Sequence, residues 1–193
     1  PDDQPAKREF RWRLAAKYGR VPAEPSEVDC CDFSRVLLEE YFRIVREEFK
    51  RAAPHKLYLG CRFSAPDPFS VLPAGKYVDV MSFNCYRWDV VGFPYMPKEI
   101  DKPVMIGEFH FGAMDRGPVH PSLLQCKDQQ ARAEAYKRYV TSALRDPRFV
   151  GVHWHQYFDT PATGRFDGEN FQNGCVDVCD TPYVETIEAV RWI

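Results

Sequence analysis

The chain has 193 residues, of which 45% are hydrophobic and 15% aromatic, and its formal net charge at pH 7 is −2. That length suits one domain or part of a larger one, and the near-neutral charge argues against the basic stripe that nucleic-acid binding favours. The longest apolar runs are far shorter than the roughly 18 residues that a membrane helix needs, and no signal peptide is present. We therefore expect neither a nucleic-acid nor a membrane partner.

The chain begins at Pro1 without a methionine, so we expect a processed, trimmed or partial protein. Its seven cysteines are an odd number without CxxC pairs, which argues against a disulfide framework and against a zinc knuckle. Cys175 and Cys179 lie four residues apart, but no second pair completes a four-ligand site. This cysteine usage leans towards a reducing compartment without deciding it.

The first part of the chain predicts helices and no strand. Residues 6–18 have helical character, and residues 20–31, with two prolines, are typical of a loop. A second helix is predicted over 34–52, where apolar residues recur at helical spacing. Asp32 or Ser34 is its expected N-cap.

Four apolar runs then predict strands, over residues 56–63, 77–86, 102–112 and 149–158. Between the first two, residues 64–76 hold three prolines, so we expect a short helix or none. Residues 128–144 predict an amphipathic helix, and Thr181 is expected to cap a last helix with Pro182 at its first position. Continuous apolar strands that alternate with helices or long loops indicate βα units around a parallel sheet.

Polar and aromatic side chains gather at the C-terminal end of each predicted strand: Arg62, Ser64, Asn84, Tyr86, Glu108, His110, Trp154, Gln156 and Asp159. A (β/α)₈ barrel keeps its active site at that end, as does an open doubly wound sheet, but the chain has no glycine-rich phosphate loop. A barrel needs eight strands and about 250 residues. The sequence therefore predicts an α/β fold in which residues 1–193 form the C-terminal part, about four βα units, of a TIM (β/α)₈ barrel, preceded by the two helices.

The third predicted strand, KPVMIGEFHFG, places Glu108 two residues before His110. If Val104 and Ile106 face the interior, the period of two directs Glu108 and His110 to the same side at the strand's mouth. A partly desolvated carboxylate there needs a partner. It is either a structural group bonded to a neighbouring arginine or tyrosine, or a catalytic nucleophile or acid–base.

Glycoside hydrolysis would need a second carboxyl group, about 5–5.5 Å away in retaining enzymes and about 6.5–9.5 Å away in inverting ones. The mouth loops offer four carboxylates, which are commonly just solvated: Asp115, Asp159, Asp167 and Glu169. A metal site at His110, His153 and His155 is an alternative, but their spacing fixes no further ligand. We expect no metal and no cofactor.

Four segments resemble the C-terminal half of the agarases of glycoside hydrolase family 50: KLYLGCRFS, VDVMSFNCY, KPVMIGEFHFGAMDRG and GVHWHQYFDTPATGRFDGENFQNGCVDVCDTPY. These enzymes belong to a large clan of (β/α)₈ retaining glycosidases. The resemblance covers nearly the whole chain, and the last segment, with DGEN and DTPY, is its most specific part. It implies a cofactor-independent glycosidase that cleaves β-linked galactans such as agarose, with the four strands as strands five to eight of the barrel.

The resemblance also implies roles for single residues. Glu108 matches the nucleophile at the end of strand seven, and Tyr86 is similar to the tyrosine that hydrogen-bonds this nucleophile. Trp154 is similar to the tryptophan that stacks under the sugar, and the peptide bond from Trp154 to His155 is then expected to be cis. Other residues are implied to contact the substrate: Arg62, Asn84, His110, His155, Gln156, Asp167, Glu169 and Asn170.

Two departures from the family leave alternatives open. The family's acid/base glutamate follows an asparagine on strand four, which is expected upstream of this chain. His155 stands where relatives usually have an aromatic residue, WHQY in place of WFQY, so the substrate is open. The alternatives are a β-galactosidase-like exo-glycosidase of the same clan and a catalytically incomplete sugar-binding or scaffold fragment.

A partial barrel exposes the flanks of its outer strands, so we expect it to pair with a second copy or with its missing half. A polysaccharide-degrading enzyme would be secreted or periplasmic, whereas the cysteine usage leans towards the cytoplasm. The sequence thus leaves the localisation open.

Overall fold

The computed structural model describes residues 4–117 and 120–193, and the chain divides into two compact units. A helical unit comprises Pro1–Tyr58 and Asp67–Val78, and a sheet unit comprises Leu59–Pro66 and Asp79–Ile193. The four strands and all of the residues predicted for the site belong to the sheet unit.

The helical unit contains α1 (Pro5–Tyr18), α2 (Glu27–Ala52) and α3 (Pro68–Tyr77). The first helix is confirmed, but α2 begins at Glu27, so the predicted cap is wrong and the loop predicted over 20–31 ends at residue 26. The cause is a capping box, in which the Ser26 hydroxyl accepts the Asp29 N–H and the Asp29 carboxylate accepts the Ser26 N–H, both at 3.2 Å.

Helix α3 is longer than the short helix expected between the first two strands. Its N-cap Asp67 accepts the Ser70 N–H at 3.0 Å, and Pro68 occupies the first turn, where a missing N–H costs nothing. Lys76 of α3 pairs with Glu39 of α2 at 2.8 Å. Pro68 therefore starts the helix instead of preventing it, and the helix continues past Pro73.

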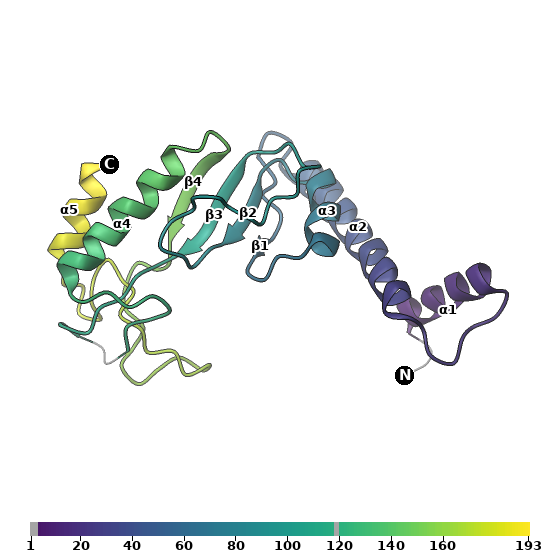
Figure 1. The fold of residues 1–193 in the computed structure, drawn as a ribbon, viewed down its shortest axis with the longest axis horizontal. Helices are drawn as coiled ribbons and strands as arrows, with labels where there is room; N and C mark the ends of the chain where they lie inside the picture. The colour runs from purple at the N-terminus through teal and green to yellow at the C-terminus, as the bar shows by residue number, and fades with distance from the viewer. Residues whose placement is uncertain (1–3, 118–119) are drawn as a thin grey trace. The chain divides into compact units, whose positions relative to one another are not determined.

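The sheet unit is built on a four-stranded parallel sheet in the order β1-β2-β3-β4, which confirms the predicted parallel arrangement (Figure 1). Its strands are β1 (Arg62–Phe63), β2 (Met81–Asn84), β3 (Val104–Phe109) and β4 (Phe149–Trp154). The ladder is irregular between Phe83 and Asn84 and again between Ile106 and Phe109. Strands β1 and β4 are the two edges of this sheet.

Each strand is shorter than the apolar run that predicted it. Gly60, at φ 64°, interrupts the first run just before β1, and α3 takes Tyr77 from the second. The fourth run leaves the sheet after His155, whose N–H donates the last bond to the Phe109 carbonyl at 3.0 Å. The boundaries thus follow the backbone hydrogen bonds and not the end of apolar composition.

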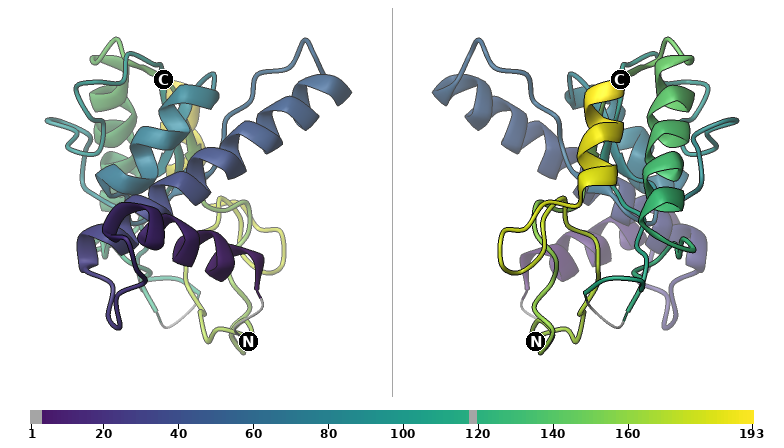
Figure 2. Two further views of the ribbon diagram at one scale, coloured as in Figure 1. Left: turned by 90° about the vertical axis from the view of Figure 1, so that its right-hand side faces the viewer. Right: turned by 90° about the vertical axis from the view of Figure 1, so that its left-hand side faces the viewer.

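Two helices complete the sheet unit, and they lie side by side (Figure 2). Helix α4 (Gln129–Leu144) confirms its prediction, with Asp128 as N-cap accepting the Ala131 N–H at 2.8 Å. Helix α5 (Val184–Trp192) begins after the predicted start, because Thr181 closes a turn with Asp177 and does not cap. In that turn the Thr181 N–H donates to the Asp177 carboxylate and the Asp177 N–H donates to the Thr181 carbonyl, both at 2.9 Å.

The core lies between the sheet and α4. The Phe109 ring stacks on Tyr139 at 4.1 Å between centroids, and the Tyr139 hydroxyl donates to the Cys85 carbonyl at 2.8 Å. Beyond this core, the loops after β3 and β4 gather at the C-terminal end of the strands (Figure 1). Within the described ranges, no helix combines the length and apolar character needed to cross a bilayer.

Candidate active site

The Glu108 carboxylate near the end of β3 takes one donor on each oxygen. The Tyr86 hydroxyl donates to Oε2 at 2.6 Å, and the Arg62 Nη1 lies 2.7 Å from Oε1. The Glu108 side chain is 15% exposed, so it is largely shielded yet reachable. Residues from β1, from the loop after β2 and from β3 thus meet at one carboxylate, as a site at the strand ends requires.

Glycine at position 107 makes the Arg62 contact possible. A Cβ built on Gly107 would lie 2.6 Å from the Arg62 Cδ and 2.8 Å from the Ser82 hydroxyl, which real Cβ atoms do not tolerate. Without that atom the Arg62 side chain runs across β3 to Glu108. Its Nη1 also donates to the Gly107 carbonyl at 3.4 Å.

Tyr86 is held as a donor by its surroundings. Burial, and then its hydrogen bond to Glu108, raise the pKa of the Tyr86 hydroxyl well above its usual range. The ring also lies against His110, with 4.7 Å between the centroids. The phenol therefore keeps its proton and points it at the carboxylate.

His110 is 2% exposed, and both of its ring nitrogens are bonded to the backbone. The His155 carbonyl can only accept, so Nδ1 carries the proton and donates to it at 3.0 Å, while Nε2 accepts the Leu123 N–H at 3.4 Å. Burial lowers the pKa of His110 to about 4, which agrees with this neutral tautomer. His110 thereby ties the end of β3 to the end of β4, and its predicted substrate contact stays a prediction.

The Trp154 indole is bonded and packed within the protein. Its Nε1–H donates to the Asn173 carbonyl at 2.7 Å, and its ring packs against Phe109 and against Tyr136 of α4, with centroids 5.3 and 5.5 Å away. The guanidinium of Arg132, also on α4, lies 5.3 Å from the indole centroid. The structure thus places Trp154 among residues of the helix layer.

His155, the next residue, lies on the side of Glu108 and its partners. Its ring centroid is 5.9 Å from that of His110, and its Nδ1 is buried without a hydrogen-bond partner in the described chain. The cis peptide bond joins His155 to Gln156, so the predicted cis bond at Trp154–His155 is wrong. His155 still donates to β3 through its N–H, and the chain turns away only after it.

Asn84 ends β2 directly opposite Glu108 in the ladder. Its Oδ1 is buried and, like Nδ1 of His155, has no partner among the described atoms. Buried polar atoms are nearly always hydrogen-bonded, so two unpaired atoms at the ends of β2 and β4, on either side of β3, can be satisfied by ligand hydroxyls. Gln156 follows His155, and its N–H donates to the Asn173 carbonyl at 3.4 Å.

The loop after β4 carries the remaining predicted residues. Asp167 and Glu169 both pair with Arg165, at 2.7 and 2.5 Å, and Asn170 is half-buried next to them. Hydrogen bonding to Asp167, with smaller contributions from the Glu169 and Glu108 charges, raises the pKa of Arg165. Arg165 therefore lies within electrostatic reach of Glu108, and the two carboxylates of this loop share one arginine as their partner.

Asp159 is fully buried instead of lying in the mouth. Its carboxylate accepts the Tyr183 hydroxyl at 2.5 Å and the Gly174 N–H at 2.8 Å. Burial raises its pKa. Asp115 accepts from the Gln129 backbone and side chain at 3.1 and 3.0 Å, so neither carboxylate is a free partner for Glu108.

Arg132 is a residue that the sequence reasoning missed. It lies on the buried face of α4 and is 0% exposed. A signal was present, because Gln129, Arg132, Tyr136 and Tyr139 recur at helical spacing on one face.

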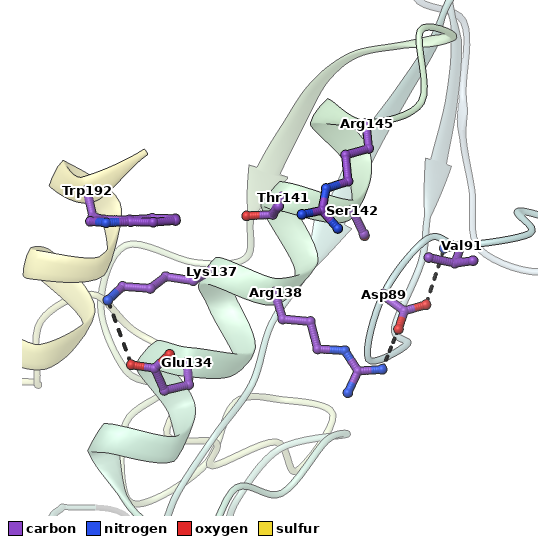
Figure 3. A pocket seen from close by; sticks show the side chains of 9 residues that line it. All are labelled: Asp89, Val91, Glu134, Lys137, Arg138, Thr141, Ser142, Arg145 and Trp192. Atoms are coloured by element: carbon purple, nitrogen blue, oxygen red, sulfur yellow. Dashed lines mark hydrogen bonds and ion pairs between the residues drawn. The ribbon is translucent and has the colours of Figure 1, made fainter.

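A cavity of about 540 Å³ opens between α4, α5 and the loop after β2 (Figure 3). It is lined by Asp89, Val91, Glu134, Lys137, Arg138, Thr141, Ser142, Arg145 and Trp192. Two ion pairs, Arg138 with Asp89 and Lys137 with Glu134, occupy its walls. None of the predicted site residues lines it, so the Glu108 cluster stands as the candidate active site. Residues 4–117 and 120–193 contain no group of three or more histidine, cysteine, aspartate and glutamate side chains arranged to hold a metal ion.

No protein-family model matches the chain. β-Agarase B of Vibrio sp. (strain JT0107) is 44% identical over 168 residues, which are 84% of this chain and 18% of that protein. β-Agarase A of the same organism is 41% identical over 162 residues, 79% of this chain and 16% of that protein. The chain thus spans less than a fifth of these curated relatives.

A solved exo-β-agarase structure superposes with a TM-score of 0.88 at 37% identity, covering 99% of this chain and 30% of that one. The superposition includes both units and all four strands. The chain therefore matches a segment of a longer protein in sequence and in fold.

Proposed function

Since the chain is a homologue of the agarases of glycoside hydrolase family 50, we propose that it forms part of a retaining glycoside hydrolase that cleaves β-linked galactans such as agarose. In this proposal the four strands are strands five to eight of a (β/α)₈ barrel. The single observation that carries the proposal is the Glu108 carboxylate, shielded at a strand end and bonded by Tyr86 and Arg62.

Glu108 is the proposed nucleophile. Its carboxylate attacks the anomeric carbon as the glycosidic C–O bond breaks, and the departing oxygen takes a proton from the acid/base carboxyl group. Water, deprotonated by the same acid/base group, then hydrolyses the glycosyl–enzyme ester and releases the sugar. The two donors, Tyr86 and Arg62, support this role because they fix the carboxylate in one orientation. As the ester forms, the negative charge leaves Glu108, and both donors then face an oxygen of a neutral group.

The rest of the strand-end cluster supplies proposed sugar contacts. Asn84 Oδ1 and His155 Nδ1 are buried polar atoms without partners in the described chain, and sugar hydroxyls would satisfy them. The predicted contacts of Arg62, His110, Trp154, Gln156, Asp167, Glu169 and Asn170 remain part of the proposal. Trp154 is the last residue of β4, and His155 follows it. Because His155 lies beside His110, it is favoured over Trp154 for direct contact with the sugar.

The acid/base carboxylate is proposed to come from sequence outside this chain. The mouth loop offers Asp167 and Glu169, but both are engaged in ion pairs with Arg165. Asp159 is buried against Tyr183. None of the three is placed to protonate a leaving group.

The test is Glu108→Gln in the full-length enzyme, assayed on agarose. Because the amide cannot form the ester, kcat is expected to fall roughly 10³-fold or more. Glu134→Gln on the exposed face of α4 is the matched control and is expected to leave turnover unchanged. Normal activity of Glu108→Gln would sink the assignment.

The stereochemistry of the first product tests the mechanism separately. The proposal expects the anomeric configuration to be retained when the reaction is followed by NMR, before the product equilibrates. An inverted product would mean that Glu108 is not a nucleophile.

A second candidate concerns the 193-residue polypeptide by itself. The engagement of Asp159, Asp167 and Glu169 with other residues favours a catalytically incomplete, sugar-binding fragment. A β-galactosidase-like exo-glycosidase keeps the same site with another substrate. Comparing products from agarose with those from small aryl galactosides separates that enzyme from an agarase.

A further inference from the structure

Arg132 is a cation buried inside the sheet unit. Its side chain is fully shielded, and no carboxylate of the described residues lies within ion-pair distance. Burying a charge without a close counter-ion is costly, and burial lowers the pKa of this guanidinium. A residue kept in such a position needs compensating contacts and a reason for them.

Three oxygen atoms provide the compensation. Nε donates to the Phe111 carbonyl at 2.8 Å, Nη2 to the Gly174 carbonyl at 2.6 Å, and Nη1 to Oε1 of Gln129 at 3.2 Å. Two rings flank the group, since its central carbon lies 5.3 Å from the Trp154 centroid and 5.1 Å from the Tyr183 centroid. These contacts therefore fix both the position and the orientation of the guanidinium.

The two carbonyl acceptors belong to the segments that leave β3 and that return to β4. Phe111 directly follows His110, three residues after Glu108. Gly174 follows Asn173, whose carbonyl accepts from the Trp154 indole and from the Gln156 N–H. One side chain of α4 thus bonds to the exit of β3 and to the later segment that is itself bonded to the exit of β4.

The backbone has no free space next to either of these two segments. A Cβ built on Gly174 would lie 2.3 Å from the Asp159 nitrogen, and one on Gly112 would lie 1.9 Å from the Pro121 carbonyl oxygen. Both backbones are already packed against other backbone. A change in the Arg132 contacts would therefore shift whole segments and not only a side chain.

We propose that Arg132 is a positioning residue, which sets the spacing between the strand ends that carry Glu108 and His155. The proposal rests on the proposed glycosidase site. An arginine is required because its planar fork reaches two carbonyls in different directions while its faces stack on rings, which a lysine ammonium cannot reproduce. Arg132 touches no substrate and acts through the backbone at Phe111 and Gly174.

The experiment compares Arg132→Lys with Arg138→Lys in the full-length enzyme. Arg138 lies on the same helix but is exposed and pairs with Asp89, so its variant is the matched control and should behave as wild type. For Arg132→Lys we expect kcat to fall roughly tenfold to a hundredfold, because a displacement of the reacting groups by an ångström costs rate. KM should change by less than about threefold, since the sugar contacts themselves remain.

The split between kcat and KM separates positioning from plain stability. If Arg132→Lys only lowers the thermal midpoint, and its kcat equals that of wild type well below that midpoint, the proposal is overturned. If Glu108→Gln is active, the proposed function fails first. If Glu108→Gln is inactive while Arg132→Lys turns over normally, only the positioning role fails.

A second pair of variants covers the case in which Arg132→Lys does not fold. Tyr183→Phe and Tyr183→Leu both lose the hydroxyl bond to Asp159, but only the leucine variant removes a ring from the guanidinium. We expect kcat to be lower for Tyr183→Leu than for Tyr183→Phe at similar KM. Equal kcat values for the two folded variants would overturn the proposal.

Discussion

Tyr86 is the donor whose hydrogen bond to Glu108 can be removed with little other change. In Tyr86→Phe the ring still packs on His110 and Arg62 still pairs with the carboxylate. A hydrogen bond to a charged group contributes about 1.5–3 kcal/mol, so we expect kcat/KM to fall by about one to two orders of magnitude. Steady-state kinetics of the full-length enzyme measure this.

The control for that variant is Ser142→Ala, which also removes a single hydroxyl, one that donates to the Tyr139 carbonyl at 2.7 Å and accepts the Val90 N–H at 3.0 Å, away from Glu108. It is expected to lower the free energy of unfolding by about 1 kcal/mol and to leave kcat/KM near wild type. Equal kinetic effects of the two substitutions would mean that the Tyr86 hydroxyl has no special relation to the reaction.

The buried ring of His110 makes the free energy of unfolding depend on pH. Burial disfavours the charged ring and lowers the pKa of His110 from its ordinary value of 6.5 to about 4 in the folded chain. The unfolded chain therefore binds the proton first, and this contribution to the free energy of unfolding is complete above pH 6.5. It is lost as pH falls towards about 4, with a slope approaching 1.4 kcal/mol per pH unit.

The measurement is urea unfolding of wild type, His110→Gln and His153→Gln from pH 4 to pH 7. His110→Gln should be less stable at pH 7, because a backbone tie is lost, but flatter across this range. His153 is exposed, so its variant should follow the wild-type curve. A His110→Gln curve parallel to wild type would contradict the assignment of the buried neutral ring.

At the residue scale, the sequence predicted the bonding partners of Glu108 better than the side-chain contacts of β4. A shielded Glu108 was expected to bond an arginine or a tyrosine, and it bonds both. The side chains of β4 were harder, because a period of two cannot register the ladder irregularity between Ile106 and Phe109. Arg132 escaped notice because a charged residue on a surface helix is normally solvated.

Elements were predicted well where one local signal dominated. Helix α4 has an aspartate cap and a clear apolar face, and its start and end agree with the sequence. Helices α2 and α5 begin elsewhere because two short motifs compete at each start. At α2 the Ser26 capping box adds two turns, and at α5 the Asp177 carboxylate holds Thr181 in a turn.

The strands show the same limit. Apolar composition gave their number, order and parallel sense, which are long-range consequences of burial on both faces. Their lengths depend on where backbone bonding stops, as at Gly60 before β1 and at the residue after His155. Backbone geometry sets these strand ends, and hydrophobic periodicity carries no information about it.

At the scale of the whole molecule, the sheet has two open edges. Strand β1 pairs through only Arg62 and Phe63, whereas β4 is six residues long. Val150 on β4 is 56% exposed. A long edge strand with apolar side chains is a template for another strand, so β4 is the edge from which the predicted pairing with a second copy or a missing half would proceed.

The 193-residue chain expressed alone is therefore expected to self-associate and to leave agarose uncleaved. Sedimentation velocity should show dimers or larger species that diminish in Val150→Lys, because a charge on the edge opposes strand pairing. Val178→Lys, at an equally exposed valine outside the strands, should associate like wild type. A monomeric wild-type chain would contradict the open edge. Cleavage of agarose by the isolated chain would place the acid/base inside it, and Asp167 and Glu169 would then be the carboxylates to replace, since the charge of Glu108 acts on Arg165, their shared partner.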